Sequence, residues 1–256
     1  MNGESFYKEF YNGGANALSK AENFRDRNPI VKQLADSRPL GETVGHELNE
    51  ANLQKVMNLI DASEMIVLDT ILNQNDRFGN IHYKTENVFV KQKPDGTIKL
   101  KLKKKPKGDQ TAGQLTVKKM ILKDNDCGVA KINIAKQANL SAKISHMNPE
   151  TYSRLQKFSQ MIELPEVISF FKNEMHFTED DFRGFHQNLT ELASELRQRC
   201  ETRKLKLDLD LDAHFSNLPP APVACDCQVD FKKRNVILRR NFPFRILEGM
   251  AFSAEK

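Results

Sequence analysis

A long amphipathic segment dominates the first half of the chain. Between residues 47 and 72 apolar side chains recur at helical spacing, and the second half of the segment is apolar on most faces. These side chains are Leu53, Val56, Met57, Ile60, Met65, Val67, Leu68 and Ile71. The spacing predicts a helix that is buried towards its C-terminal end. The loop that follows it would therefore be attached to a rigid base.

The next part of the chain changes from helical spacing to alternation. Two runs, at 87–93 and 97–103, flank Pro94-Asp95-Gly96, which is a strong hairpin signal. The second run alternates isoleucine or leucine with lysine, as expected for a strand with one buried face. After a polar loop, a third strand is predicted at 115–123.

From about residue 148 the pattern is mainly helical. Asn148-Pro149 is an N-cap followed by proline at the first helical position, and Pro165 restarts a helix. Thr178-Glu179-Asp180-Asp181 resembles a capping box, and the apolar positions beyond it predict a helix to about Arg203. Residues 204–212 alternate leucine with charge, which predicts a strand or an extended edge.

The composition is that of a globular protein on the polar side, with 39% hydrophobic and 29% charged residues among 256. Such a chain can bury one or two cores. No apolar run approaches the roughly 20 residues of a membrane span, so we expect no transmembrane segment. The N-terminus lacks a signal-peptide profile, although delivery into a host cell by a dedicated secretion machine would not require one.

Cysteines and histidines exclude several classes of protein. The four cysteines (Cys127, Cys200, Cys225 and Cys227) are too few and too scattered for a disulfide framework, and the Cys-x-Cys pair is poorly spaced for zinc. We therefore expect reduced thiols and a reducing, cytoplasmic compartment. The histidine spacings and the absence of a G-x-S-x-G elbow argue against zinc and serine hydrolases.

Two polar motifs follow predicted elements. Asn73-Gln74-Asn75-Asp76-Arg77 comes after the long helix, and Asp124-Asn125-Asp126-Cys127-Gly128 comes after the third strand. A carboxylate that orients an acceptor, together with an amide and a second carboxylate that hold Mg²⁺ against a triphosphate, suits phosphoryl transfer. Helix, loop, strand, connection, strand and Asp-x-Gly is also the order of these groups in a kinase catalytic lobe.

On these motifs the chain resembles the atypical branch of the protein-kinase-like superfamily: HipA toxins, type II phosphatidylinositol 4-kinases and Golgi secretory-pathway kinases. These families share an Asn-x-Asp-Arg loop after an apolar helix, and several have a later Asp-Asn-Gly. The resemblance implies an α+β fold with a kinase-like C-lobe, in which a small β-layer carries the catalytic loop and a mainly helical subdomain packs beneath it. It also implies ATP and Mg²⁺ or Mn²⁺ as cofactors.

The resemblance divides the chain into four segments. They are an N-terminal extension or remnant of the connection to an N-lobe (1–46), the catalytic-loop and metal-binding segment (47–147), the helical subdomain (148–215), and a linker with the C-terminal tail (216–256). The first segment contains two predicted short helices, at 16–24 and 29–36, and no Gly-rich strand pair or V-A-I-K-like strand. No complete N-lobe is visible; it would lie upstream or in another chain, or the nucleotide would be covered differently.

The resemblance also implies roles for single residues. Asp76 would orient the acceptor hydroxyl, and Arg77 would buttress the loop or form a surface ion pair. The metal-binding amide would be Asn80, which is one residue short of the usual kinase spacing, or Asn87, which directly precedes a strand. We prefer Asn80.

The second carboxylate has two candidates as well. Asp124-Asn125 aligns with the atypical branch without a gap, whereas Asp126-Cys127-Gly128 matches Asp-x-Gly. We prefer Asp124 as the metal ligand, with Asp126 assisting it or holding a second ion. A solvated acidic turn is the plain structural alternative.

Lysines are concentrated in the predicted hairpin and the loop after it. Those of the second strand and the loop are Lys99, Lys101, Lys103, Lys104, Lys105 and Lys107. They form either a solvated face or a docking surface for anionic lipid, inositol polyphosphate or an acidic protein. Nucleic acid is disfavoured because only Tyr83 and Phe89 are close by for base stacking.

These observations lead to three functional hypotheses. The first is an ATP- and metal-dependent phosphotransferase acting on a hydroxyl, with a protein Ser/Thr kinase preferred. The second is a pseudokinase or adaptor that binds an anionic partner through the lysine-rich hairpin. The third is a phosphoinositide kinase. Activity of the chain alone is expected to be low unless an activating partner or an N-lobe completes the nucleotide site.

Overall fold

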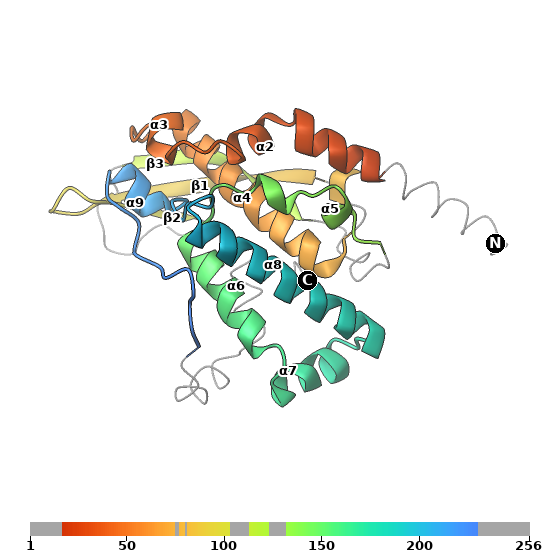
Figure 1. The fold of residues 1–256 in the computed structure, drawn as a ribbon. Coiled ribbons are helices and arrows are strands. Elements are labelled where there is room, and N and C mark those ends of the chain that lie inside the picture. Colours follow the sequence, from red (N-terminus) through yellow and green to blue (C-terminus); the bar gives the residue numbers. More distant parts are fainter. Residues whose placement is uncertain (1–16, 75–76, 80, 103–112, 123–131, 230–256) are drawn as a thin grey trace.

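The structure is a computed structural model, and it describes residues 17–74, 77–79, 81–102, 113–122 and 132–229. Its centre is the long helix α4 (Glu50–Leu72), which contacts a three-stranded sheet, the N-terminal helix α2 and the long C-terminal helix α8 (Figure 1). The predicted mixed α+β class is confirmed.

Helix α4 matches the helix predicted at 47–72, although it begins three residues later. Its start is set by Asn49, whose side chain accepts a hydrogen bond from the backbone N–H of Asn52. Every residue from Asp61 to Ile71 is buried. The second half of α4 is apolar on most faces, and it contacts both the sheet and α8. The predicted burial of the C-terminal end of the helix is therefore confirmed.

The sheet has the strand order β2-β1-β3 and is antiparallel throughout. Its strands are β1 (Ile81–Gln92), β2 (Ile98–Leu102) and β3 (Gly113–Leu122). The hairpin around Pro94-Asp95-Gly96 is confirmed, and Gly96 has the positive φ of 84° that favours glycine in such a turn.

The two faces of the sheet differ sharply. Val88, Val90 and Val117 point into the core, together with the half-buried apolar residues of β2. The alternate positions form a face that we call the open face: Tyr83, Thr85, Asn87, Phe89, Lys91, Lys99, Lys101, Gln114, Thr116 and Lys118, with Met120, at the same register, buried. The alternation of β2 is therefore as predicted, with Lys99 and Lys101 exposed.

Helix α4 covers the outer edge of β3. Three of its side chains accept hydrogen bonds from alternate backbone N–H groups of that strand: Glu50 from Thr116 (3.0 Å), Gln54 from Lys118 (2.6 Å) and Asp61 from Met120 (2.7 Å). These N–H groups would otherwise be available to another strand. This edge is therefore satisfied within the chain.

The opposite edge, that of β2, is covered by α9 (Leu211–Phe215). Its first-turn residue Asp212 accepts from the N–H of Leu100 (2.8 Å), and Ser216 accepts from the N–H of Ile98 (2.8 Å). Side chains thus bind backbone donors on the outer edges of both β2 and β3, which leaves fewer of them for a further strand.

The remaining helices follow the predicted signals closely. Helices 17–27, α2 (Pro29–Leu34) and α3 (Leu40–Thr43) precede α4, and α5 (Ile134–Gln137), α6 (Pro149–Met161), α7 (Pro165–Ser169) and α8 (Glu179–Glu201) follow the sheet. The side chain of Asn148 caps α6, and Thr178 forms the predicted capping box with Asp181 at the start of α8. A π-helical turn, Phe170–Glu174, ends the α7 region.

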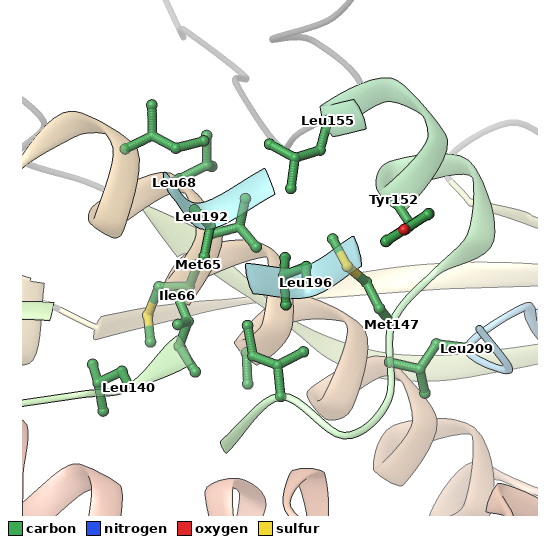
Figure 2. Packing of buried hydrophobic residues seen from close by; sticks show 14 of the residues in the cluster. Met65, Ile66, Leu68, Leu140, Met147, Tyr152, Leu155, Leu192, Leu196 and Leu209 are labelled. Carbon is green, nitrogen blue, oxygen red and sulfur yellow. The ribbon is translucent and has the colours of Figure 1, made fainter. Parts of the chain in front are cut away.

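The core lies where α4, α6 and α8 meet. Figure 2 shows Met65, Ile66 and Leu68 of α4 close to Leu192 and Leu196 of α8, with Tyr152 and Leu155 of α6 beside them. In the part of the chain that the structure describes, no helix is long and apolar enough to cross a membrane.

The predicted strand or extended edge at 204–212 is not a regular strand, and its last two residues belong to α9. Lys206 forms a single parallel bridge with His146, and Leu205 and Leu209 are buried. Leu207 and Leu211 are only half-buried, as are Lys206 and Asp208, so burial does not follow the alternation strictly, and the neighbouring segment supplies backbone partners over only a few residues.

The expectation of reduced thiols is wrong for two of the four cysteines. Cys200, at the end of α8, forms a disulfide with Cys225, while Cys227 is a buried free thiol. Sequence spacing could not show this, because the two residues are 25 positions apart and the fold alone brings them together. The disulfide does not establish the compartment, so cytoplasmic localisation stays a prediction.

Candidate functional site

The C-terminal end of α4 is a left-handed cap. Asn73 adopts φ 56° and ψ 35°, a conformation that asparagine tolerates better than most residues, and its N–H donates to the carbonyl of Asp69. The N–H of Gln74 donates to the same carbonyl (3.2 Å). The first residues of the Asn73–Arg77 motif are therefore bound to the helix end rather than projecting freely from it.

A buried ion pair joins Arg77, the last residue of this motif, to Asp69 on α4. Arg77 Nε lies 3.1 and 3.3 Å from the two carboxylate oxygens of Asp69, and the two side chains are 2% and 1% exposed. Burial raises the pKa of the Asp69 carboxyl to about 7, and the Arg77 guanidinium opposes this shift. The Arg77 side chain is therefore buried and supports the loop, and it does not form a surface ion pair.

The Asn73 side chain joins three parts of the chain. Its amide oxygen accepts from Asn133 Nδ2, just before α5, and from Asn188 Nδ2 on α8, each at 2.6 Å. Asn133 Nδ2 also donates to the carbonyl of Thr70 (2.7 Å). Because α4, α5 and α8 all bind at one oxygen, the start of the motif has a defined position in the fold.

The start of β1 and the end of β3 meet at one end of the sheet. Ile81 is paired with Leu122, and the short helical turn Arg77–Gly79 precedes Ile81 by one residue. Asp76, Asn80, Asp124 and Asp126 lie outside the described residues. The residues that flank them in sequence are Arg77, Ile81 and Leu122, so both motifs are attached to the same end of the sheet.

The second amide candidate, Asn87, lies elsewhere. It sits on the open face in the middle of β1, paired with Thr116. Six residues of strand separate it from Ile81, which corresponds to about 20 Å. Asn87 is therefore far along β1 from the end of the sheet at which Ile81 pairs with Leu122, and the choice between Asn80 and Asn87 stays a prediction.

Two further acidic side chains are buried on α4. Burial raises the pKa of Asp61 to about 6 and that of Glu64 to about 7, although the N–H of Met120 and the hydroxyl of Thr151, respectively, oppose these shifts. Asp61 binds the edge of β3, and Glu64 accepts from Thr151 of α6 at 2.9 Å. Both therefore join α4 to its neighbours.

The lysines predicted for docking are described only in part. Lys99 and Lys101 are exposed on the open face, whereas Lys103, Lys104, Lys105 and Lys107 lie outside the described residues. Among described side chains, no group of three or more His, Cys, Asp and Glu is arranged to hold a metal ion.

A pocket of about 370 Å³ lies between α3 and α9, away from these motifs. It is lined by Leu40, His46, Asp208, His214 and Pro220, among others. His46 Nδ1 donates to the carbonyl of His214 at 2.8 Å, and His214 Nε2 donates to that of Gly45 at 2.7 Å. These bonds hold the two segments together, and among the described residues of the Asn73–Arg77 motif none lines the pocket.

Sequence reasoning missed the residues that support the motif. A signal was available for Asp69, because a carboxylate in a fully apolar helical segment must be paired when it is buried. Asn133 and Asn188 had no such signal, because each is an ordinary cap or helix asparagine until the fold places it beside Asn73.

Comparisons with protein-family models, with curated proteins and with solved structures each found no match for this chain.

Proposed function

We propose that this chain is the catalytic lobe of an ATP- and metal-dependent phosphotransferase that acts on a hydroxyl group, with a protein acceptor preferred. The observation that carries the proposal is the buried Asp69–Arg77 pair. It ties the segment that follows Asp76 to the end of a buried helix. Phosphoryl transfer depends mainly on positioning and charge stabilisation, so its groups need such a base.

The register of the sheet supports the same proposal. Ile81, which follows the Asp76–Asn80 segment in the sequence, is paired with Leu122, which precedes Asp124 by two residues. The two motifs are far apart in the sequence, and a common end of the sheet for the described residues beside them is what the proposal requires.

The donor types at the motifs fit the proposed cofactors. Mg²⁺ and Mn²⁺ prefer carboxylate and amide oxygens, which Asp124 and Asn80 would supply. When bound, the metal would neutralise charge on the ATP phosphates. Asp76 would orient the acceptor hydroxyl, while Arg77, which already pairs with Asp69, would act as a positioning residue.

A labelled-ATP assay tests the proposal. Purified protein is incubated with γ-labelled ATP and Mg²⁺ or Mn²⁺, with casein-like protein in one arm and mixed phosphoinositides in another. We expect transfer to the protein acceptor, and a loss of at least about 100-fold in Asp76→Ala and Asp124→Ala. Asp180→Ala, which removes an exposed carboxylate on α8, is the matched control and should transfer like the wild type.

The outcomes separate the three hypotheses. Transfer to lipid alone would identify a phosphoinositide kinase and would overturn the protein-acceptor preference. Label in the wild type that does not exceed that in the two aspartate variants would reject the phosphotransferase and leave the non-catalytic adaptor. The assay is repeated with any N-terminally extended form of the chain, because a separate lobe over the nucleotide would raise activity.

A further inference from the structure

We infer that residues 218–222, with the sequence Leu-Pro-Pro-Ala-Pro, are a docking motif for a globular domain that binds polyproline II helices in an aromatic-lined groove. This inference does not rest on the proposed phosphotransferase activity. The motif follows α9 and belongs to the blue segment without helix or arrow in Figure 1. It contains the Pro-x-x-Pro spacing that is typical of such ligands, between Pro219 and Pro222.

The sequence favours the polyproline II conformation at every position of the motif. The ring fixes φ at about −65° in each of the three prolines. A following proline keeps Leu218, Pro219 and Ala221 in the extended region of the backbone map. A polyproline II helix has no internal hydrogen bonds, and residues 219–223 make no hydrogen bond to any residue that the structure describes. Their carbonyl groups are therefore available to a partner.

Burial along this segment has the period of a polyproline II helix. Pro220 and Val223 are half-buried, since Pro220 lines the pocket beside α9 and Val223 packs against the core. The other residues of the segment are exposed: Leu218 (49%), Pro219, Ala221 and Pro222. Because this helix has three residues per turn, positions three apart share one edge. One edge therefore lies against the protein, and the other two edges are open to a partner.

Both ends of the motif are anchored. The N–H of Leu218 donates to the carbonyl of Ala213 in α9 at 2.9 Å. Cys225, which lies three residues after the motif, forms the disulfide with Cys200 of α8, and its carbonyl accepts from the hydroxyl of Tyr152 at 2.6 Å. A partner would bind a segment that is already extended and held at both ends, so little conformational freedom is lost on binding.

The residues beside the prolines decide which kind of groove fits. No lysine or arginine occurs at 207–231, so a groove that selects its ligands through an acidic pocket finds no cation next to the motif in the chain. The exposed Leu218 directly precedes the first proline, and its burial in an apolar pocket would stabilise a complex. We therefore expect an EVH1-type groove with an apolar pocket, and not an SH3-type groove with an acidic one.

Titration calorimetry tests the inference on the full chain without reductant. The probes are a purified EVH1 domain and a purified SH3 domain with an acidic specificity pocket. We expect saturable binding of the EVH1 domain only, and its displacement by a polyproline peptide that occupies the groove. Pro219→Ala/Pro222→Ala should weaken binding by about tenfold or more, because both prolines of one open edge are lost.

The matched control is Pro94→Ala/Pro165→Ala, which removes two exposed prolines outside the motif. It should keep binding within about twofold, since distant sites act independently. Circular dichroism and thermal unfolding show whether each variant retains the fold. Leu218→Ala, which keeps all prolines, is a second test of the motif and should weaken binding by about threefold or more, because apolar contact is lost.

The inference is overturned by any of three results. One is no saturable binding of the wild type to the EVH1 domain, or binding that is no tighter than that of the SH3 domain. Another is an equal loss in the control variant. The third is binding that persists in an excess of the polyproline peptide, which would place the contact outside the aromatic-lined groove.

Discussion

At the C-terminal end of α4 a carboxylate and a guanidinium are both buried and bind each other, whereas on the open face lysines stand exposed beside other lysines. In the first arrangement burial makes the pairing of Asp69 with Arg77 important for stability. In the second, the exposed Lys99 and Lys101 are solvated, so their charges cost little. The comparison shows that the same chain uses charge for rigidity in one place and presents it to solvent in another.

The largest effect on stability is expected when the buried Asp69–Arg77 pair is broken. Arg77→Met leaves Asp69 buried without a cation, and we expect a loss of about 3–5 kcal/mol in the free energy of unfolding at pH 8. The double variant Asp69→Leu/Arg77→Met should recover most of this loss, because neither charge remains. Urea unfolding of the single and double variants measures the coupling.

Arg183→Met is the control for that experiment, since Arg183 forms an exposed ion pair with Asp180 on α8. Its cost should stay below about 0.5 kcal/mol. Equal losses for Arg77→Met and Arg183→Met would contradict the view that burial makes the first pair important.

The next largest effect concerns Asn73, whose side-chain oxygen accepts hydrogen bonds from Asn133 and Asn188. Asn73→Ala removes the acceptor of Asn133 and Asn188 and places alanine in the left-handed region, which asparagine tolerates better, so we expect a loss of about 2–3 kcal/mol. Asn73→Gly relieves the backbone and still lacks the acceptor. It should recover only part of the loss in thermal or urea unfolding, and full recovery would show that the amide contacts contribute nothing.

The pH dependence of stability tests the effect of burial on a further charged group of α4, Glu64. Its pKa is raised to about 7 in the folded protein, so the folded state binds more protons than the unfolded state between about pH 4 and pH 7, and stability falls as pH rises through that window. Glu64→Gln removes this term. It should be more stable than the wild type at pH 8 by about 1–3 kcal/mol and similar at pH 4. A parallel pH dependence of the two proteins would refute the assignment.

The smallest effect is expected at the open face. Lys99→Gln/Lys101→Gln should change the free energy of unfolding by less than about 0.5 kcal/mol, or raise it slightly, because these charges repel each other and support no buried contact. Urea unfolding checks this. A loss as large as that of Arg77→Met would show that the lysines hold the sheet together.

Local pattern was a good guide to most of the elements. The spacing of Leu53 to Ile71, the Pro94-Asp95-Gly96 turn, and the caps at Asn148 and Thr178 each act within a few residues of chain, so they could be interpreted without the fold. The bounds shifted by a few residues because caps such as Asn49 decide where a helix begins.

The supports of the candidate site could not be predicted in the same way. Asp69 and Arg77 are eight residues apart, and Asn73 meets Asn188 across 115 residues. The Cys200–Cys225 disulfide could not be predicted for the same reason, because its two cysteines are 25 residues apart in the sequence. Each of these contacts depends on where whole helices pack, and no local spacing encodes that.

The sequence by itself determined the helices, the hairpin and the alternation that turns one row of lysines to solvent, because these follow from contacts between near neighbours in the chain. Only the tertiary structure decided which polar groups are buried together at the end of α4, which end of the sheet both motifs leave from, and which helices close its edges. Those outcomes follow from long-range packing, where a buried charge must find its partner or cost the fold its stability.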